Sequence, residues 1–176
     1  FMPPANYNGD VTIDVTVSDG QLTDTGSFIV TVISVNDPPV LVTLDDISIA
    51  EDNTLTYTLF AMDVDGDSLT YSATSDYGSV SVDESTLSLI PPLNYNGNIV
   101  VTVTVSDGEL TDSGSFTVTV TPINDAPVID FIADQEVDED NTFTYTLSAE
   151  DVDSNSTEFE YTASLNGNGS VSVDGT

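Results

Sequence analysis

The sequence repeats with a period of 88 residues, and this repeat limits the folds that are open to it. The motif Asn-Tyr-Asn-Gly at residues 6–9 recurs at 94–97, and Val-Ser-Asp-Gly at 17–20 recurs at 105–108. Three more pairs share the offset of 88: Asn-Asp-Pro-Pro at 36–39 with Asn-Asp-Ala-Pro at 124–127, Glu-Asp-Asn at 51–53 with 139–141, and Asp-Val-Asp at 63–65 with 151–153. Five motifs at one offset indicate a tandem array, in which each repeat is one structural unit.

The register of the repeat shifts once. The motif Gly-Ser-Val-Ser-Val-Asp at 78–83 recurs at 169–174, an offset of 91, so three residues are inserted after the second Asp-Val-Asp motif. We interpret the chain as two repeats taken from a longer array and cut in the middle of a domain. Residues 1–37 would be the C-terminal part of one domain, residues 38–125 a complete domain, and residues 126–176 the N-terminal part of the next domain.

Each repeat is predicted to consist of short β-strands. In residues 99–105 apolar side chains alternate with Thr102 and Thr104, and the same period of two recurs in 116–120 and 55–59. Such alternation is typical of strands with one buried face. Further candidate strands are 40–49, interrupted near residues 45 and 46, and 69–73, 79–82 and 86–90. No segment shows a helical period with capping residues.

Seven short strands in a repeat of 88 residues match the size of an immunoglobulin-like sandwich. The expected fold class is therefore all-β, with tandem immunoglobulin-like seven-stranded Greek-key β-sandwiches. The two long strands around Ser106-Asp107-Gly108 would form a hairpin. An up-and-down barrel is the alternative, but the tandem period favours small sandwiches joined end to end.

The chain contains no Lys, Arg or His but 31 Asp and Glu residues, so its formal net charge is −31. Since it cannot form a side-chain salt bridge, ions from outside the chain have to balance this charge. Nucleic acid is excluded as a partner because no side chain can neutralise phosphate. Membrane insertion is not expected because no apolar run reaches the roughly 18–20 residues of a spanning helix. Adaptation to high salt is an alternative reason for the acidity.

Catalysis is not expected either. Cys, His and Lys are all absent, so the chain lacks the side chains that most often act as base or nucleophile near neutral pH. A pair of carboxylates could hydrolyse a glycosidic bond, but the acidic residues here recur at turn and linker positions in both repeats. This recurrence indicates an architectural role rather than one unique active-site cleft.

The chain offers only oxygen ligands to a metal ion, and calcium takes roughly six to eight oxygens from carboxylates and carbonyls. Asp63, Asp65 and Asp67 crowd three carboxylates into one turn between strands, where they would repel one another without a cation. The alternative is that Asp and Gly simply favour a turn. An EF-hand is excluded because the twelfth position of such a loop is Thr74 and no helices flank it.

Taken together, these motifs resemble the cadherin-like tandem repeats of large bacterial surface proteins and adhesins. The resemblance rests on Pro-Pro-Ala-Asn-Tyr-Asn-Gly at 3–9, Val-Ser-Asp-Gly at 17–20, Val-Asn-Asp-Pro-Pro at 35–39, Glu-Asp at 51–52 and Asp-Val-Asp-Gly-Asp at 63–67. It implies a fold similar to that of cadherin domains, a role in adhesion or surface display and an extracellular location. It also implies that the partners are neighbouring repeats or identical subunits.

In cadherins calcium lies between successive domains, so the resemblance also implies a set of Ca²⁺ ligands. At the first junction the linker would supply Asp37 and the backbone of Asn36, and the following domain would supply Asp63, Asp65 and Asp107, with Asp67 as a further candidate. At the second junction the matching residues are Glu51, Asn124, Asp125, Asp151 and Asp153. Asp19 and Glu139, one period away from Asp107 and Glu51, complete the candidate ligands. Asn155 replaces Asp67 in the next repeat.

We therefore expect a structural role as a calcium-rigidified repeat segment of a long extracellular stalk, adhesin or fibre. Two alternatives stay open. The domains could themselves bind a cell-surface glycan or protein, with Asn6, Tyr7 and Asn8 among the contacts. Alternatively, residues 126–176 of one chain could pair with residues 1–37 of another, which would build a filament by strand complementation.

Overall fold

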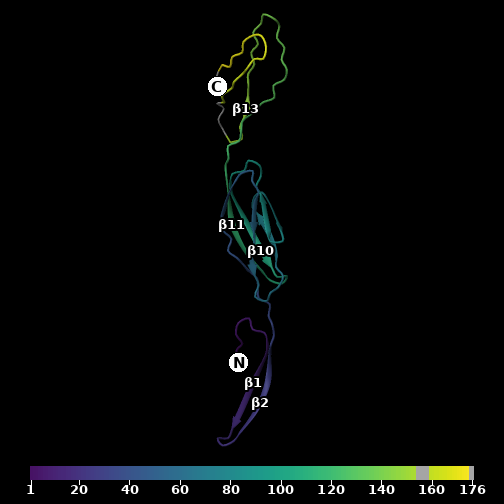
Figure 1. Ribbon diagram of the computed structural model, residues 1–176, viewed down its shortest axis with the longest axis vertical. Coiled ribbons are helices and arrows are strands. Elements are labelled where there is room, and N and C mark those ends of the chain that lie inside the picture. Colours follow the sequence, from purple (N-terminus) through teal and green to yellow (C-terminus); the bar gives the residue numbers. More distant parts are fainter. Residues whose placement is uncertain (154–158, 175–176) are drawn as a thin grey trace.

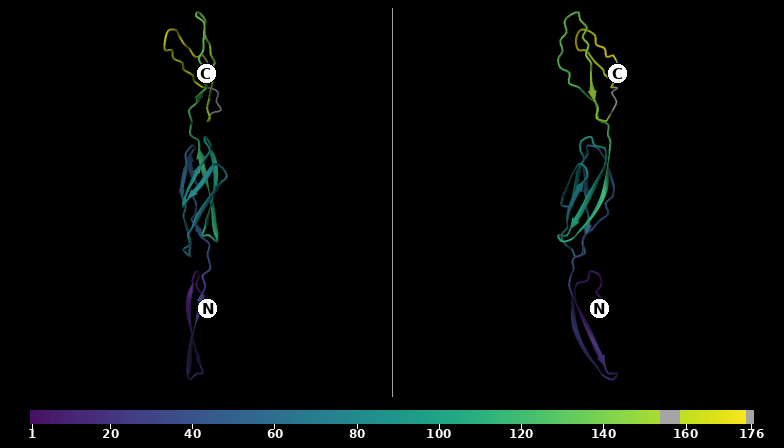
Figure 2. Two further views of the ribbon diagram at one scale, coloured as in Figure 1. Left: turned by 90° about the vertical axis from the view of Figure 1, so that its right-hand side faces the viewer. Right: turned by 180° about the vertical axis from the view of Figure 1, so that it is seen from behind.

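The computed structural model describes residues 1–153 and 159–174. It is an extended rod in which three parts follow one another along the long axis (Figure 1). The two further views show the same succession, with a hairpin at one end, a sandwich in the middle and an irregular part at the other end (Figure 2). The described residues form no helix, so no membrane-spanning helix is found among them.

The N-terminal part is an antiparallel hairpin of β1 (Gly9–Ser18) and β2 (Thr23–Val32). Opposite residues on the two strands include Ile13 with Phe28 and Val11 with Val30. Because side chains alternate along a strand, these four apolar residues share one face of the hairpin. The turn between the strands lies at the end of the rod, remote from the central part (Figure 1).

The central part is a sandwich of two main sheets. One sheet has the order β4-β11-β10-β7 and the other the order β5-β9-β8, while β3 and β6 form a short two-stranded ladder. All neighbours are antiparallel except β4 and β11, which run parallel. The strands are β3 (Val40–Leu41), β4 (Ile47–Ala50), β5 (Leu55–Thr58), β6 (Ala61–Met62), β7 (Thr70–Ser75), β8 (Ser79–Asp83), β9 (Thr86–Ile90), β10 (Gly97–Ser106) and β11 (Thr111–Thr121).

The core lies between these two sheets, and its members are the apolar residues of the alternating strands. On β10 and β11 the inward side chains of Ile99, Val101, Val103, Phe116 and Val118 are 0–3% exposed. The facing sheet contributes buried leucines, and the ring of one tyrosine stacks on Phe116 at 5.2 Å between centroids. The all-β sandwich prediction is confirmed, because period-two alternation buries one face of each strand and leaves the threonine face to solvent.

The segment 40–49 was predicted as one interrupted strand, and the structure divides it between two ladders. β3 pairs with β6, whereas β4 pairs with β11. The interruption has a polar cause, since the Asp46 Oδ1 accepts a hydrogen bond of 2.7 Å from the backbone N of Thr117. This side chain occupies the N–H of Thr117 within β11, and the parallel ladder of β4 with β11 begins at the next pair, Ile47 with Val118. The short strand β6 was not predicted.

In the described residues of the C-terminal part, 126–153 and 159–174, the strands are β12 (Val128–Ile129) and β13 (Ala149–Glu150), which pair antiparallel. They stand one period after β3 and β6. No other strand forms among these described residues, although residues 143–147 carry the same alternation as β5. In the central part β5 pairs with β9, and β4 with β11, and residues 126–174 contain no counterpart of β9 or β11. A strand without a partner leaves its backbone N–H and C=O groups unpaired.

Candidate metal sites at the two junctions

Two short linkers connect the three parts. We call residues 33–39, between β2 and β3, the first junction, and residues 122–127, between β11 and β12, the second junction. Each linker carries an Asn-Asp pair and at least one proline. The linkers bring carboxylates from different strands and turns to the same place.

At the first junction the linker is tied to two acidic turns of the central sandwich. The backbone N of Asp37 donates to Asp65 Oδ2 at 2.8 Å, and the side-chain Nδ2 of Asn36 donates to Asp107 Oδ2 at 2.9 Å. The sequence-predicted residues Asn36, Asp37, Asp65 and Asp107 are thus brought together. The structure uses the amide side chain of Asn36 to reach Asp107, whereas the resemblance implied a role for its backbone.

The turn at 63–67 holds three carboxylates close together. One oxygen each of Asp63, Asp65 and Asp67 lies within 4.8 Å of the others. The Oδ1 of Asp63 accepts from the backbone N of Asp65, Gly66 and Asp67, at 2.9, 3.0 and 3.3 Å. Gly66 has a φ of 83°, a conformation that favours glycine. A simple Asp-Gly turn accounts for these bonds of Oδ1.

An Asp-Gly turn does not account for the second carboxylate oxygen of Asp63. The Oδ2 of Asp63 is buried and has no hydrogen-bond partner among the described residues. A buried carboxylate oxygen without a partner costs free energy, because that oxygen has lost its hydrogen bonds to water and has formed none in the protein. The burial of this oxygen is therefore an observation that a turn alone does not explain.

The second junction repeats this arrangement. The backbone N of Asp125 donates to Asp153 Oδ2, as Asp37 does to Asp65 one period earlier. The backbone N of Asp153 in turn donates to Asp151 Oδ1 at 2.9 Å. Asn124 differs from its counterpart, because its Nδ2 donates to the backbone O of Asp125 at 2.7 Å. The Oδ2 of Asp125 is buried and, within the part of the chain that is described, has no hydrogen-bond partner.

Glu51 closes the second junction from the side of the central sandwich. It is only 2% exposed, and its backbone N donates to the O of Thr121 at 2.9 Å. Its Oε1 accepts from the backbone N of Ile123 at 2.7 Å. Its Oε2 is buried and finds no hydrogen-bond partner in residues 1–153 or 159–174. Oε1 thus holds Glu51 at the linker, while Oε2 accepts no hydrogen bond from the described residues.

The carboxylates at the second junction repel one another. Burial raises the pKa of Asp125 above its usual 3.8, and the negative charges of Asp153, Asp52, Glu51 and Asp151 raise it further. Asp52 was not among the predicted ligands. It has a φ of 62° and its Oδ1 accepts from the backbone N of Asn94 at 2.8 Å. Its position next to Glu51, in the Glu-Asp-Asn motif that recurs at 139–141, could have indicated Asp52 as a ligand.

In the two Ser-Asp-Gly turns the pKa of the aspartate is lowered, whereas that of Asp125 is raised. Hydrogen bonds from the backbone N of Leu110 and Glu109, and then from the Asn36 side chain, lower the pKa of Asp107. The backbone N of Leu22 and of Gln21 does the same for the pKa of Asp19. Both carboxylates are therefore held in the charged form by the turns that they close.

Some of the predicted ligands do not meet at either junction. Asp19 lies in the turn of the N-terminal hairpin, and Glu139 in a turn of the C-terminal part. Both stand one period away from residues that do meet at a junction. Asp67 belongs to the acidic turn at 63–67 but is exposed. Asn155 lies outside the described residues.

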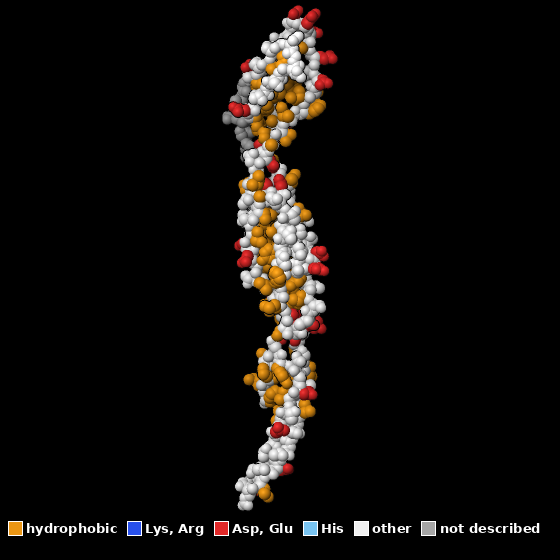
Figure 3. Space-filling model, in the orientation of Figure 1, with side chains coloured by type: hydrophobic (Ala, Val, Ile, Leu, Met, Phe, Trp, Pro, Cys, Tyr) orange, Lys and Arg blue, Asp and Glu red, His pale blue; other side chains and the backbone are white. Residues whose placement is uncertain are grey.

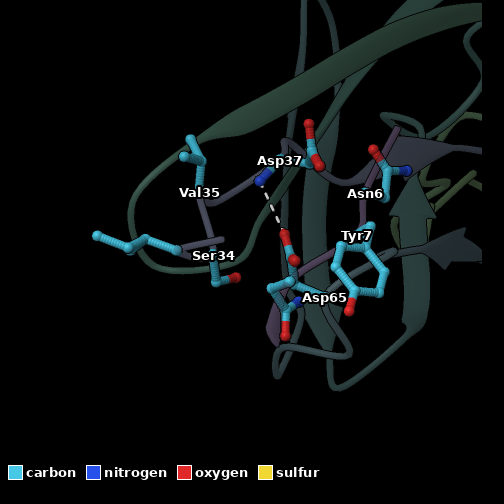
Figure 4. A pocket seen from close by; sticks show the side chains of 8 residues that line it. Asn6, Tyr7, Ser34, Val35, Asp37 and Asp65 are labelled. Carbon is cyan, nitrogen blue, oxygen red and sulfur yellow. Dashed lines mark hydrogen bonds between the residues drawn. The ribbon is translucent and has the colours of Figure 1, made fainter. Parts of the chain in front are cut away.

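A hollow of about 240 Å³ adjoins the first junction. The loop of Asn6, Tyr7 and Asn8 lines one side, and Asp37 and Asp65 line the other (Figure 4). The Tyr7 hydroxyl donates to the backbone O of Asp10 at 3.3 Å, so this side chain is used within its own turn. The hollow opens onto the same two aspartates that connect the linker to the central sandwich.

The comparison with protein families matches the central part. Residues 36–121 correspond to the family model of a bacterial Ig domain. This confirms the prediction of a bacterial Ig-like repeat, and Ig domains of this kind are in general not enzymes. Asn36 and Asp37 of the first linker lie inside the range that the family model matches.

Similar chains among solved structures include several cadherin fragments. Drosophila N-cadherin EC1-4 is 16% identical, with 83% of this chain and 43% of that chain covered and a TM-score of 0.46. Mouse protocadherin-24 EC1-3 is 18% identical, with 82% and 56% covered and a TM-score of 0.45. An endo-fucoidan hydrolase of glycoside hydrolase family 107 is 23% identical, with 68% of this chain but only 20% of the hydrolase covered and a TM-score of 0.38. Among curated proteins the sequence has no match.

Proposed function

We propose that this chain is a segment of a long extracellular stalk or adhesin in which calcium locks each Ig-like domain against the next. In this proposal residues 38–125 are one complete domain, and residues 1–37 and 126–176 are parts of its two neighbours. The fold supports a structural repeat module, and the acidic junctions support the choice of ion.

One observation carries the proposal. Buried carboxylate oxygens without a hydrogen-bond partner occur, among the described residues, in Glu51, Asp63 and Asp125. All three residues were candidate ligands, and they lie at or beside the two junctions. In a chain with no Lys, Arg or His, no side chain can neutralise these groups. Cations that coordinate Asp63 at the first junction, and Glu51 and Asp125 at the second, would remove the cost of burying these oxygens.

The donor set fits calcium better than other common metals. The groups available are carboxylate, amide and backbone oxygens, which suit a hard cation that takes roughly six to eight oxygen ligands. At the first junction the ligands would come from Asn36, Asp37, Asp63, Asp65, Asp67 and Asp107. At the second junction they would come from Glu51, Asp52, Asn124, Asp125, Asp151 and Asp153.

A bound ion would act on the mechanics of the chain. Each set of ligands includes a linker aspartate and carboxylates of the domain that follows, so the ion would bridge segments that can otherwise move apart. Pro38, Pro39 and Pro127 restrict the same linkers by fixing their φ angles. Pro39 is in addition fully buried. The result would be a stiff rod rather than domains on flexible tethers.

The hollow beside Asn6, Tyr7 and Asn8 does not require a separate sugar site. Two of its lining residues, Asp37 and Asp65, belong to the proposed ligands of the first junction, so we assign the hollow to that metal site. The glycan-binding alternative accordingly has no observation of its own.

The experiment is a chelator titration at constant ionic strength. We expect removal of calcium to lower the melting temperature. We also expect it to broaden the distribution of molecular dimensions that small-angle X-ray scattering measures, because the domains could then bend at the linkers. Sodium chloride at high concentration serves as the control, because salt adaptation would let it replace calcium. An unchanged length and melting temperature in chelator at low salt would overturn the proposal.

A further inference from the structure

The outward face of the short β3–β6 ladder carries four exposed apolar side chains. The ladder pairs Val40 with Met62. One step further along, the backbone N of Val42 donates to the O of Phe60 at 2.9 Å. Leu41 packs against the core, so the residues on either side of it point outward, because side chains alternate along a strand. We call the outward residues the ladder face: Val40, Val42, Phe60 and Met62, which are 60%, 44%, 63% and 69% exposed.

The next repeat builds the same ladder with polar side chains on this face. The backbone N of Asp130 donates to the O of Ser148 at 2.9 Å, as Val42 does to Phe60 one period earlier. Three of the four positions of the ladder face are polar and exposed in that repeat: Asp130, Ser148 and Glu150. The ladder therefore forms without apolar side chains at these positions, and folding does not explain the apolar residues of the ladder face.

A sandwich that precedes the ladder along the rod does not cover this face. At the second junction the central sandwich, with both of its sheets, precedes the ladder of β12 and β13. Val128, which corresponds to Val40, is nevertheless 69% exposed there, and Asp130 and Ser148 are exposed as well. The ladder face itself lies in the range that the family model of the bacterial Ig domain matches. Its exposure thus does not depend on the N-terminal part of the chain.

The residues of the ladder face form one contiguous patch, since they are paired or neighbouring positions of a single ladder. Apolar side chains interrupt the polar surface of the central part on the side of the rod that Figure 3 shows. Single apolar residues on a surface need no explanation, whereas a contiguous apolar patch marks an interaction site. Phenylalanine and methionine are both enriched at protein–protein interfaces, and the ladder face contains one of each.

A partner would lie on the face of the ladder and would not add a strand to its edge. β3 pairs with β6 on one side. On its other side the backbone N of Leu41 already donates to Asp112 Oδ2 at 2.8 Å, so this edge has no free donor at Leu41 for a further strand. Recognition would therefore depend on side chains rather than on a backbone ladder.

Negative charges lie next to the ladder face. β6 leads directly into the acidic turn at 63–67, where carboxylate oxygens of three aspartates lie within 4.8 Å of one another. Asp63 is the neighbour of Met62 in the chain, and so lies well inside the screening length of about 8 Å at physiological salt. Calcium ions at the junctions would offset only part of the net charge of −31. The charge around the ladder face therefore favours a partner with positive charge.

A second copy of this chain does not meet that requirement. The chain contains no Lys, Arg or His, so two ladder faces in contact would bring two acidic turns together without a cationic side chain between them. Like charges placed against each other across an interface oppose association. A partner that carries Lys or Arg would instead be attracted to the same place.

We propose that the ladder face is a docking surface for a protein segment in which apolar side chains are flanked by Lys or Arg. Phe60 and Met62 would provide the largest apolar contacts, and the aspartates of the turn at 63–67 would attract the flanking cations. The site is specific to the central repeat, because the next repeat has polar residues at three of the four positions. This inference does not depend on calcium at the junctions.

The test is isothermal titration calorimetry of the 176-residue chain with a short peptide in which Lys alternates with Leu. A control peptide has Ser in place of each Leu and the same charge. The triple variant combines Val42→Asp, Phe60→Ser and Met62→Glu, the residues that the next repeat carries at these positions, so its ladder should still form. We expect the Lys-Leu peptide to bind this variant at least about tenfold more weakly, since the apolar area that it would bury is gone. Thermal melting of the central sandwich checks that the variant is folded.

The charge that the triple variant adds separates apolar from electrostatic binding. Two new carboxylates should strengthen any binding that depends on charge alone, so the Lys-Ser peptide should bind the variant no less tightly than the unchanged chain. Thr102→Asp, at an exposed position of β10, is the control variant and should not weaken binding of the Lys-Leu peptide. Because all these chains share every other apolar surface, the difference between them reports on the ladder face.

Equal binding of the Lys-Leu peptide by the unchanged chain and the triple variant would overturn the inference. Dimers in analytical ultracentrifugation that the triple variant abolishes would do the same, because they would assign the ladder face to a second copy of the chain. The loss of affinity in the triple variant should occur both in calcium and in chelator. The stiffness of the rod is measured separately, so either proposal can fail without the other.

Discussion

Glu51 Oε1 accepts a hydrogen bond of 2.7 Å from the backbone N of Ile123, which lies 72 residues further along the chain. This contact fixes the exit of β11 to the turn that follows β4. The second carboxylate oxygen of Glu51 is buried without a hydrogen-bond partner among the described residues. One side chain therefore has a structural role through one oxygen and an unsatisfied charge on the other. The first prediction separates these two roles.

Glu51→Gln keeps an oxygen that can accept from Ile123 and removes the charge. In calcium we expect this variant to be destabilised by about 1–3 kcal/mol, the range for loss of a buried charged interaction. In chelator we expect it to be as stable as the unchanged chain or more stable, since the uncompensated charge has gone. Thermal melts in both buffers make the measurement. Glu84→Gln, at an exposed position, is the control; equal losses in the two buffers would contradict a role in calcium binding.

The pH dependence in chelator follows from Asp125. Its pKa in the folded chain is raised above the usual 3.8, so the native state binds this proton more tightly than the unfolded state does. Stability should therefore increase as the pH falls from neutral through the folded pKa towards 3.8, and the effect should saturate below it. Asp107 has a lowered pKa, so its contribution is lost only below 3.8. The window of increasing stability thus lies above that value.

Melting temperature against pH in chelator measures this effect, and Asp125→Asn should abolish much of the increase. With calcium present the trend should reverse, because protonation competes with the metal for the same oxygens. A stability that falls steadily on acidification in chelator would contradict the assigned electrostatics of the second junction.

The acidic turn offers a contrast between neighbouring aspartates. Asp63→Ala removes the acceptor for three backbone N–H groups and should cost about 1–2 kcal/mol even in chelator. Asp67→Ala leaves those acceptors in place and should have an effect only when calcium is present. Unfolding by urea, with and without chelator, distinguishes the two. Similar losses for both variants in chelator would show that Asp63 does not organise the turn.

Phe116 and Phe28 occupy the same position in successive repeats but not the same environment. Phe116 is 3% exposed and Phe28 is 51% exposed. Phe116→Ala should destabilise the central sandwich by about 3–5 kcal/mol, as is usual for a buried aromatic residue. Phe28→Ala should change the stability of the central sandwich, measured by thermal melting, by less than about 0.5 kcal/mol. A large effect of Phe28→Ala would contradict the exposure seen in the structure.

Much of the central fold was predictable from local patterns. The alternation in residues 99–105 and 116–120 correctly indicated the two long strands, because a strand with one buried face needs apolar residues at every second position. The resemblance assigned Asp37 and Asp65 to the same junction, and in the structure the backbone N of Asp37 donates to Asp65 Oδ2. The break of 40–49 near residues 45 and 46 was predicted as well. The pairing of its two halves with different strands, β6 and β11, was not, because it depends on partners distant in the sequence.

The recruitment of Asp52 to the second junction could not be predicted either. Its influence on Asp125 depends on how the turn after β4 is placed against the linker, and alternation says nothing about such distances. The same holds for the buried oxygens of Glu51 and Asp63. Their burial results from the packing of several segments, each of which looks like an ordinary acidic turn when taken alone.

The sequence by itself determined the repeat, the strands and the acidic linkers, since these depend on residue types at short spacings. Only the tertiary structure decided which of two similar strands has its apolar face buried. Phe28 and Phe116 stand in similar sequences, Ser-Phe-Ile-Val at 27–30 and Ser-Phe-Thr-Val at 115–118. In the described structure Phe116 is buried because a second sheet covers it, whereas Phe28 is exposed. Local preference sets what a segment can become, while long-range partners decide whether its apolar face and its charges are satisfied.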